Sequence, residues 1–163
     1  MSNVDLVMTR IDERLLHGQG QLWLRYLGAN TVIVANDAVS KDPLQQMLMQ
    51  TVVGKEVALR FFSIQKVIDV IHKASAKQHI FLVIKDCQDA LKLVQGGVPI
   101  TEINLGNIHN APGKEMITRS LYLGEQDKQS LRELHTVYHI KFNTKTTPQG
   151  NDGAAEVDIT KFI

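Results

Sequence analysis

Apolar runs rich in β-branched residues alternate with segments of helical periodicity over the N-terminal part of the chain, and this alternation constrains the fold most. The runs predict strands at 4–9, 31–35, 57–62 and 80–84, and each is followed by apolar residues at helical spacing. Strands that alternate with helices form a parallel sheet with right-handed crossovers. The sequence therefore predicts an α/β fold: a doubly wound, mainly parallel open sheet with helices on both faces.

Helix starts are marked by residues that can accept a hydrogen bond from the first turn, namely Ser40 or Asp42 before Pro43, then Ser63 and Asp86. Beyond Pro99 the elements become shorter. The pattern there predicts a strand at 101–105, a polar loop at 106–113, a strand at 116–123, an amphipathic helix at 125–138 and a strand at 140–144. The pattern leaves the element type of 156–163 open.

Length and composition suit one soluble domain that spans residues 1–163. The hydrophobic fraction is 44%, as in ordinary globular proteins. A formal net charge of +1 provides no electrostatic field over the whole surface that would attract nucleic acid, so any anion site must be local. Cys87 is the only cysteine, which suits a reducing cytoplasm. No apolar run approaches a membrane span and no cationic leader precedes the first strand, so we expect a cytoplasmic protein.

The segment 10–19, Arg-Ile-Asp-Glu-Arg-Leu-Leu-His-Gly-Gln, follows the first strand and precedes a helix expected from about Gly18 to Gly28. In open α/β sheets, ligands bind beyond the carboxyl ends of the strands. His17 lies there, between two arginines and a helix start. A neutral imidazole is a good nucleophile toward phosphorus, so the position favours a phosphohistidine.

The same segment supplies groups that can hold the phosphoryl group. Arg10 and Arg14, expected in a partly solvated loop, can donate charge-assisted hydrogen bonds, and backbone N–H groups from Gly18 and Gln19 onward add the helix N-terminus. Asp12 can orient the imidazole, or cap the turn or pair with an arginine. No metal or other cofactor is required, because positioning and charge stabilisation suffice for phosphoryl transfer.

Glu13 is expected to face solvent. The ends of other strands should border the same crevice as His17. Parallel strands gather their carboxyl ends on one side of the sheet. The expected site-lining residues are therefore Asn36, Asp37, Gly106, Asn107 and His109.

Simpler interpretations compete with this one. A lone histidine is more often an ordinary loop residue, and the pair His135 and His139 lacks a third metal ligand. Gly18 and Gly20, with Asp37 further on, resemble the start of a dinucleotide-binding fingerprint, but Trp23 occupies the place of the third glycine. A dinucleotide-binding domain, or a non-catalytic module that binds a phosphorylated partner through the arginines, therefore stays as an alternative.

The segment 10–19 resembles the phosphorylation-site motif of IIB components of the bacterial sugar phosphotransferase system, mannose/fructose/sorbose family. The resemblance extends over essentially the whole chain. It implies that His17 accepts a phosphoryl group from a phosphorylated IIA protein or domain and passes it to a sugar bound by the membrane components IIC and IID. It also implies a homo-oligomer in the cytoplasm that docks on those components.

Two details qualify the resemblance. Gly20 stands where the family usually has an apolar residue, so the first helical turn is expected to be either looser or more closely packed. Glu13 and the Leu15-Leu16 pair look most like the N-acetylgalactosamine or galactosamine branch, with mannose, fructose and sorbose still open.

Overall fold

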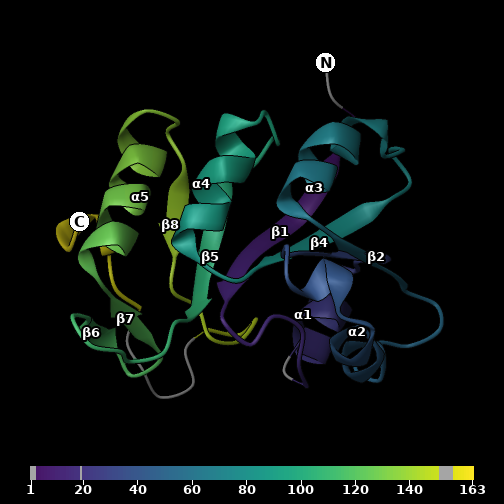
Figure 1. Cartoon of the computed structure of the whole chain (residues 1–163), viewed down its shortest axis with the longest axis horizontal. Coiled ribbons are helices and arrows are strands. Elements are labelled where there is room, and N and C mark those ends of the chain that lie inside the picture. The colour runs from purple at the N-terminus through teal and green to yellow at the C-terminus, as the bar shows by residue number, and fades with distance from the viewer. Residues whose placement is uncertain (1–2, 19, 151–155) are drawn as a thin grey trace.

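The computed structural model describes residues 3–18, 20–150 and 156–163 of the chain. Its central sheet has six parallel strands in the order β3-β2-β4-β1-β5-β8 (Figure 1). These strands are β1 (Asp5–Asp12), β2 (Thr31–Ala35), β3 (Ala58–Phe62), β4 (His79–Ile84), β5 (Glu102–Asn107) and β8 (Lys141–Asn143). The helices are α1 (Gly20–Leu27), α2 (Pro43–Gln50), α3 (Ile64–Val70), α4 (Cys87–Gln95) and α5 (Glu125–Thr136), with short 3₁₀ turns η1 (Val39–Lys41), η2 (Ile71–Lys73) and η3 (Ile159–Lys161).

Alternate residues of the central strands enter two hydrophobic layers, one on each face of the sheet. Ile80, Leu82 and Ile84 of β4 pack in the layer that also holds side chains of α3, α4 and α5. Phe81 and Val83 pack in the opposite layer, with side chains of α1 and α2. A strand that is covered on both faces buries apolar side chains on both, which is why residues 32–35 of β2 and 80–84 of β4 are continuous apolar runs. The predicted fold class is confirmed.

Predicted helix caps are also confirmed. The carboxylate of Asp42, the hydroxyl of Ser63 and the carboxylate of Asp86 each accept a hydrogen bond from a backbone N–H in the first turn of α2, α3 and α4 respectively. Gly28 ends α1 with a φ of 64°, in the left-handed region that a glycine adopts without strain. Within the described residues, no helix has the length and apolar character needed to span a membrane.

The single strand predicted at 116–123 is wrong. Residues there form an antiparallel hairpin of β6 (Glu115–Thr118) and β7 (Leu121–Leu123), seen at the lower left of Figure 1. The turn carries no glycine, proline or asparagine. It is held instead by a hydrogen bond of 3.3 Å from the Ser120 backbone N–H to the Thr118 hydroxyl. Such short hydroxyl turns are a weak sequence signal, which explains the error.

Both strands that carry the candidate site are longer than predicted. Arg10 and Asp12 belong to β1, where they pair with Asn104 and Asn107 of β5. Consequently Gly106 and Asn107 are strand residues rather than loop residues. The apolar pattern stops earlier because these positions are polar, whereas the backbone ladder between β1 and β5 continues beyond it.

The apolar stripe of α2 faces outward. Leu44, Met47 and Leu48 are 63%, 62% and 56% exposed, and Met49 is the buried residue of this helix. Helical periodicity shows that apolar residues share a face of a helix. It does not show that the protein's own sheet covers that face.

Candidate functional site

The site lies where the connections of the sheet diverge. β1 and β4 are neighbouring parallel strands, but β1 leads to α1 on one face of the sheet and β4 leads to α4 on the other. The carboxyl ends of two such strands border the crevice in which doubly wound folds bind ligands. The segment between Asp12 and α1 occupies this position.

Beyond Asp12 the chain turns back on itself, and two leucines anchor the turn. The Leu15 N–H donates to the Asp12 carbonyl at 2.8 Å, and Leu15 has a φ of 57°, which is unusual for a residue other than glycine. Leu15 and Leu16 are buried in the layer beneath α1 and α2, so apolar packing offsets the backbone strain. The turn brings His17 back over Asp12.

Asp12 is the centre of the site, and its side chain is fully buried. Its Oδ2 lies 2.9 Å from His17 Nε2 and 3.2 Å from an Arg10 guanidinium nitrogen. The Arg14 guanidinium donates to both carboxylate oxygens at 3.1 Å, and the Arg14 backbone N–H donates to Oδ1 at 3.0 Å. One carboxylate thus joins the three side chains that the sequence singled out for phosphoryl chemistry, and orienting the imidazole and pairing with arginine are combined in it.

The charge state of Asp12 follows from these contacts. Burial by itself raises the pKa of Asp12, but hydrogen bonds from His17 and Arg14 and the charge of Arg10 lower it more, so the net pKa lies well below the usual aspartate range. The carboxylate therefore stays ionised at neutral pH. It can hold the proton of the imidazole on Nε2, so that Nδ1 carries the lone pair.

Arg10 does not lie in a solvated loop, contrary to the expectation, because β1 carries it into the interior. It is 4% exposed, donates to the Asn104 side-chain oxygen and stacks 5.6 Å above the centre of the Trp23 ring. Burial lowers the pKa of Arg10, although an arginine remains charged at neutral pH. A Cβ at Gly106 would overlap the Arg10 guanidinium, so glycine there makes room for it.

Glu13 was expected to face solvent. Instead, its side chain joins the segment after β5 to the site. Its carboxylate accepts hydrogen bonds from the His109 backbone N–H at 3.0 Å and lies 2.9 Å from the His109 ring. The Glu13 backbone N–H also donates to the Asn107 carbonyl at 2.9 Å. Asn107 and His109 are therefore held beside the motif by Glu13.

The two residues after β2 have their side chains engaged elsewhere. Asn36 accepts a hydrogen bond from the Val39 N–H at 2.9 Å, and Asp37 accepts one from the Ile64 N–H at the start of α3 at 2.8 Å. The strand β4 separates β2 from β1. Gly18 is exposed, and the predicted site residue Gln19 lies outside the described residues.

Gly20 is buried against Leu16, and a Cβ at Gly20 would lie 3.0 Å from Leu16 Cδ1. The first turn of α1 is thus closely packed.

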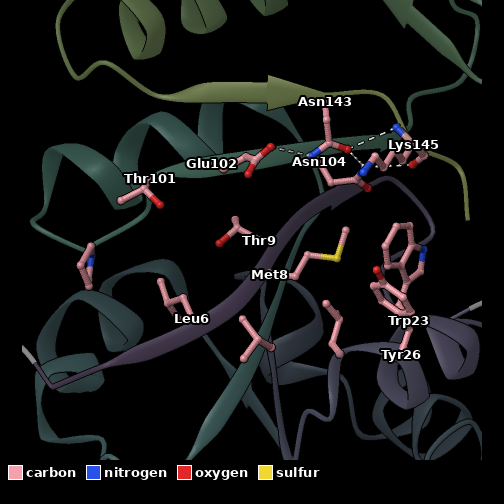
Figure 2. Close-up of a pocket in the computed structure, with 13 residues that line it drawn as sticks. Leu6, Met8, Thr9, Trp23, Tyr26, Thr101, Glu102, Asn104, Asn143 and Lys145 are labelled. Carbon is pink, nitrogen blue, oxygen red and sulfur yellow. Dashed lines mark hydrogen bonds between the residues drawn. The ribbon is translucent and has the colours of Figure 1, made fainter. Parts of the chain in front are cut away.

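Two buried polar side-chain atoms lack a hydrogen-bond partner among the described residues, Trp23 Nε1 and Asn107 Oδ1. Trp23 also borders a groove of about 260 Å³ between β1, α1 and the β5–β8 edge (Figure 2). The described ranges contain no cluster of three or more His, Cys, Asp and Glu side chains that could hold a metal ion.

Fold and site together define a class: an α/β domain that presents a histidine, an ionised carboxylate and an arginine at the carboxyl end of a central parallel strand. The model of the family described as PTS system sorbose subfamily IIB component matches residues 6–162. The chain belongs to this family, and it is a phosphotransferase component of sugar uptake.

Individual relatives agree with this assignment. The chain is 48% identical over 160 residues to the N-acetylgalactosamine-specific phosphotransferase enzyme IIB component 2 of Escherichia coli (strain K12), covering 98% of this chain and 99% of that protein. It is 30% identical to the sorbose-specific EIIB component of Klebsiella pneumoniae, covering 80% of this chain and 81% of that protein. A crystal structure of a PTS-dependent N-acetyl-galactosamine IIB component from Streptococcus pyogenes superimposes with a TM-score of 0.96 at 61% identity, over 100% of both chains.

Proposed function

We propose that His17 is the residue that accepts the phosphoryl group from a phosphorylated IIA protein and passes it to a sugar held by the membrane components IIC and IID. The hydrogen bond of 2.9 Å between His17 Nε2 and the buried Asp12 carboxylate carries this proposal. It selects the tautomer with the proton on Nε2, so the Nδ1 lone pair attacks phosphorus. The new N–P bond forms as the bond between phosphorus and the donor breaks.

The remaining site residues serve this step in different ways. Phosphorylation places a positive charge on the imidazole ring, and the ionised Asp12 stabilises that charge. Arg14, whose side chain is 35% exposed, can reach the phosphoryl oxygens. We propose that the backbone N–H groups of Gly18 and Gln19, which precede α1 in the chain, add further donors. Arg10 is buried, so we propose that it supports the phosphoryl group through Asp12. Gly106, Asn107 and His109 complete the proposed site. Asn36 and Asp37 border it beyond β4, where their side chains hold the Val39 and Ile64 N–H groups.

IIB components of this family work with IIA and with the membrane components IIC and IID. One relative is described as N-acetylgalactosamine-specific and another as an N-acetyl-galactosamine IIB component, which supports an amino sugar of this type as the transported substrate. We further propose that the protein acts as a homo-oligomer in the cytoplasm and docks on IIC and IID. Family membership disfavours the alternatives of a dinucleotide-binding domain and a non-catalytic module.

The test is intact mass after incubation with phosphoenolpyruvate, the general phosphotransferase proteins and a matching IIA. We expect one added phosphoryl group that is lost in acid and kept in mild base, and no addition in His17→Ala. His72→Ala is the matched control, because His72 is an exposed histidine in η2. Normal phosphate uptake by folded His17→Ala would refute the assignment of His17.

A further inference from the structure

The side chain of Asn104 is buried and hydrogen-bonded to Arg10. Asn104 of β5 pairs with Arg10 of β1 in register and is 1% exposed. Its Oδ1 accepts a hydrogen bond of 2.5 Å from the Arg10 guanidinium. Its Nδ2 donates to the Asn143 side-chain oxygen at 2.6 Å and to the Lys145 carbonyl at 2.9 Å, and Figure 2 shows this part of the network along one wall of the groove. Both ends of the amide are therefore engaged.

This network determines where the Arg10 guanidinium lies. The Trp23 ring packs on it, and the absence of a side chain at Gly106 allows it to fit. Trp23 and Gly106 limit where the guanidinium can lie, but neither of them accepts a hydrogen bond from one of its N–H groups. Asn104 and Asp12 accept these hydrogen bonds, so Asn104 anchors Arg10 on the side away from Asp12.

We propose that Asn104 is a positioning residue for phosphoryl transfer, acting on His17 through Arg10 and Asp12. The inference rests on the proposed function of His17. Arg10 and His17 share one oxygen of Asp12, with nitrogen–oxygen distances of 3.2 Å and 2.9 Å. If Arg10 loses its anchor, its buried N–H donors seek another acceptor and Asp12 rotates with them. The imidazole then loses the alignment that in-line attack on phosphorus requires.

The test compares Asn104→Leu with Asn143→Leu, the same change one hydrogen bond further from His17. Transfer from phosphorylated IIA is followed at increasing donor concentration, so that kcat and KM separate. For Asn104→Leu we expect kcat to fall about tenfold while KM for the donor changes less than about twofold, because alignment rather than docking is lost. Asn143→Leu should transfer at nearly the wild-type rate, since the Lys145 carbonyl still holds Asn104.

A spectroscopic measurement distinguishes positioning from general destabilisation. The ¹⁵N NMR signal of His17 Nε2 reports the hydrogen bond to Asp12, and it should move in Asn104→Leu but not in Asn143→Leu. Asn104→Ala removes the same Oδ1 acceptor without adding volume, so it should move the signal and lower kcat in the same way. It replaces the leucine variant if that variant does not fold.

Two results would overturn the proposal: an unchanged Nε2 signal with unchanged kcat in folded Asn104→Leu, or an equal loss of kcat in Asn143→Leu. If wild-type protein takes up no phosphoryl group, the proposed function fails. The Nε2 signal then still decides whether Asn104 positions His17.

Discussion

Asp12 at the end of β1 and Asp89 in the first turn of α4 are carboxylates beyond neighbouring strands, yet their pKa values move in opposite directions. Burial raises the pKa of both. At Asp12, hydrogen bonds from His17 and Arg14 and the charge of Arg10 outweigh burial, and the pKa falls well below the usual range. At Asp89, repulsion from Asp86 adds to burial, and the pKa is raised to about 6. The hydrogen-bond donors and charges around a carboxylate here, and not its burial alone, decide the direction in which its pKa moves.

Removing the Asp12 carboxylate, which binds Arg10 and Arg14, should have the largest effect on stability and phosphorylation. Asp12→Ala leaves Arg10 charged and buried without its partner, so we expect the free energy of unfolding to fall by about 3–5 kcal/mol. Phosphorylation of His17 should be nearly abolished. Urea denaturation and intact mass measure the two effects. A variant with wild-type stability would show that Asp12 does not compensate the buried charge.

The pH dependence of this contribution has a definite sign. Because the folded-state pKa of Asp12 is lowered, its stabilisation is complete above the usual aspartate pKa of about 4 and is lost as the pH falls below that value. The stability difference between wild type and Asp12→Asn should therefore be nearly constant above about pH 5 and shrink as the pH falls from about 5 to about 2. A difference that stays constant over this range would contradict the lowered pKa.

A smaller effect is expected from crowding the same cluster without removing a charge. In Gly106→Ala the new methyl group overlaps the Arg10 guanidinium, so Arg10 must shift. We expect a loss of about 1–3 kcal/mol in the free energy of unfolding, as in other overpacked interiors. Gly18→Ala is the stability control, because its added Cβ meets no atom within 4 Å. Equal stabilities of the two variants would show that Arg10 adapts freely.

The smallest effect on stability should come from replacing Asp89, the carboxylate that Asp86 repels. Its raised folded-state pKa means that its stabilisation is present below about pH 4 and is lost as the pH rises through about 6. Asp89→Asn should therefore be more stable than wild type above about pH 6, by less than about 1 kcal/mol because the group is half-exposed. Thermal melts across this pH range measure it, and parallel profiles would contradict it.

The alternation of apolar and helical segments was sufficient to predict the parallel sheet and most of its helices. Caps such as Ser63 and Asp86 marked helix starts correctly because capping is a local hydrogen bond. The hairpin after β5 was missed because a turn held by Thr118 and Ser120 has a weak signal. The ends of β1 and β5 were missed because pairing between strands extends the ladder through polar residues.

The sequence by itself determined the α/β class, the place of the motif after the first strand and the identity of the residues at the site. Tertiary structure alone decided what each of them does. It buried Arg10 and Asp12 between β4 and β5, joined Glu13 to His109 and left the apolar stripe of α2 exposed. The physical reason is that local patterns report backbone hydrogen bonds within an element, whereas the role of a charged side chain depends on partners that are distant in the chain.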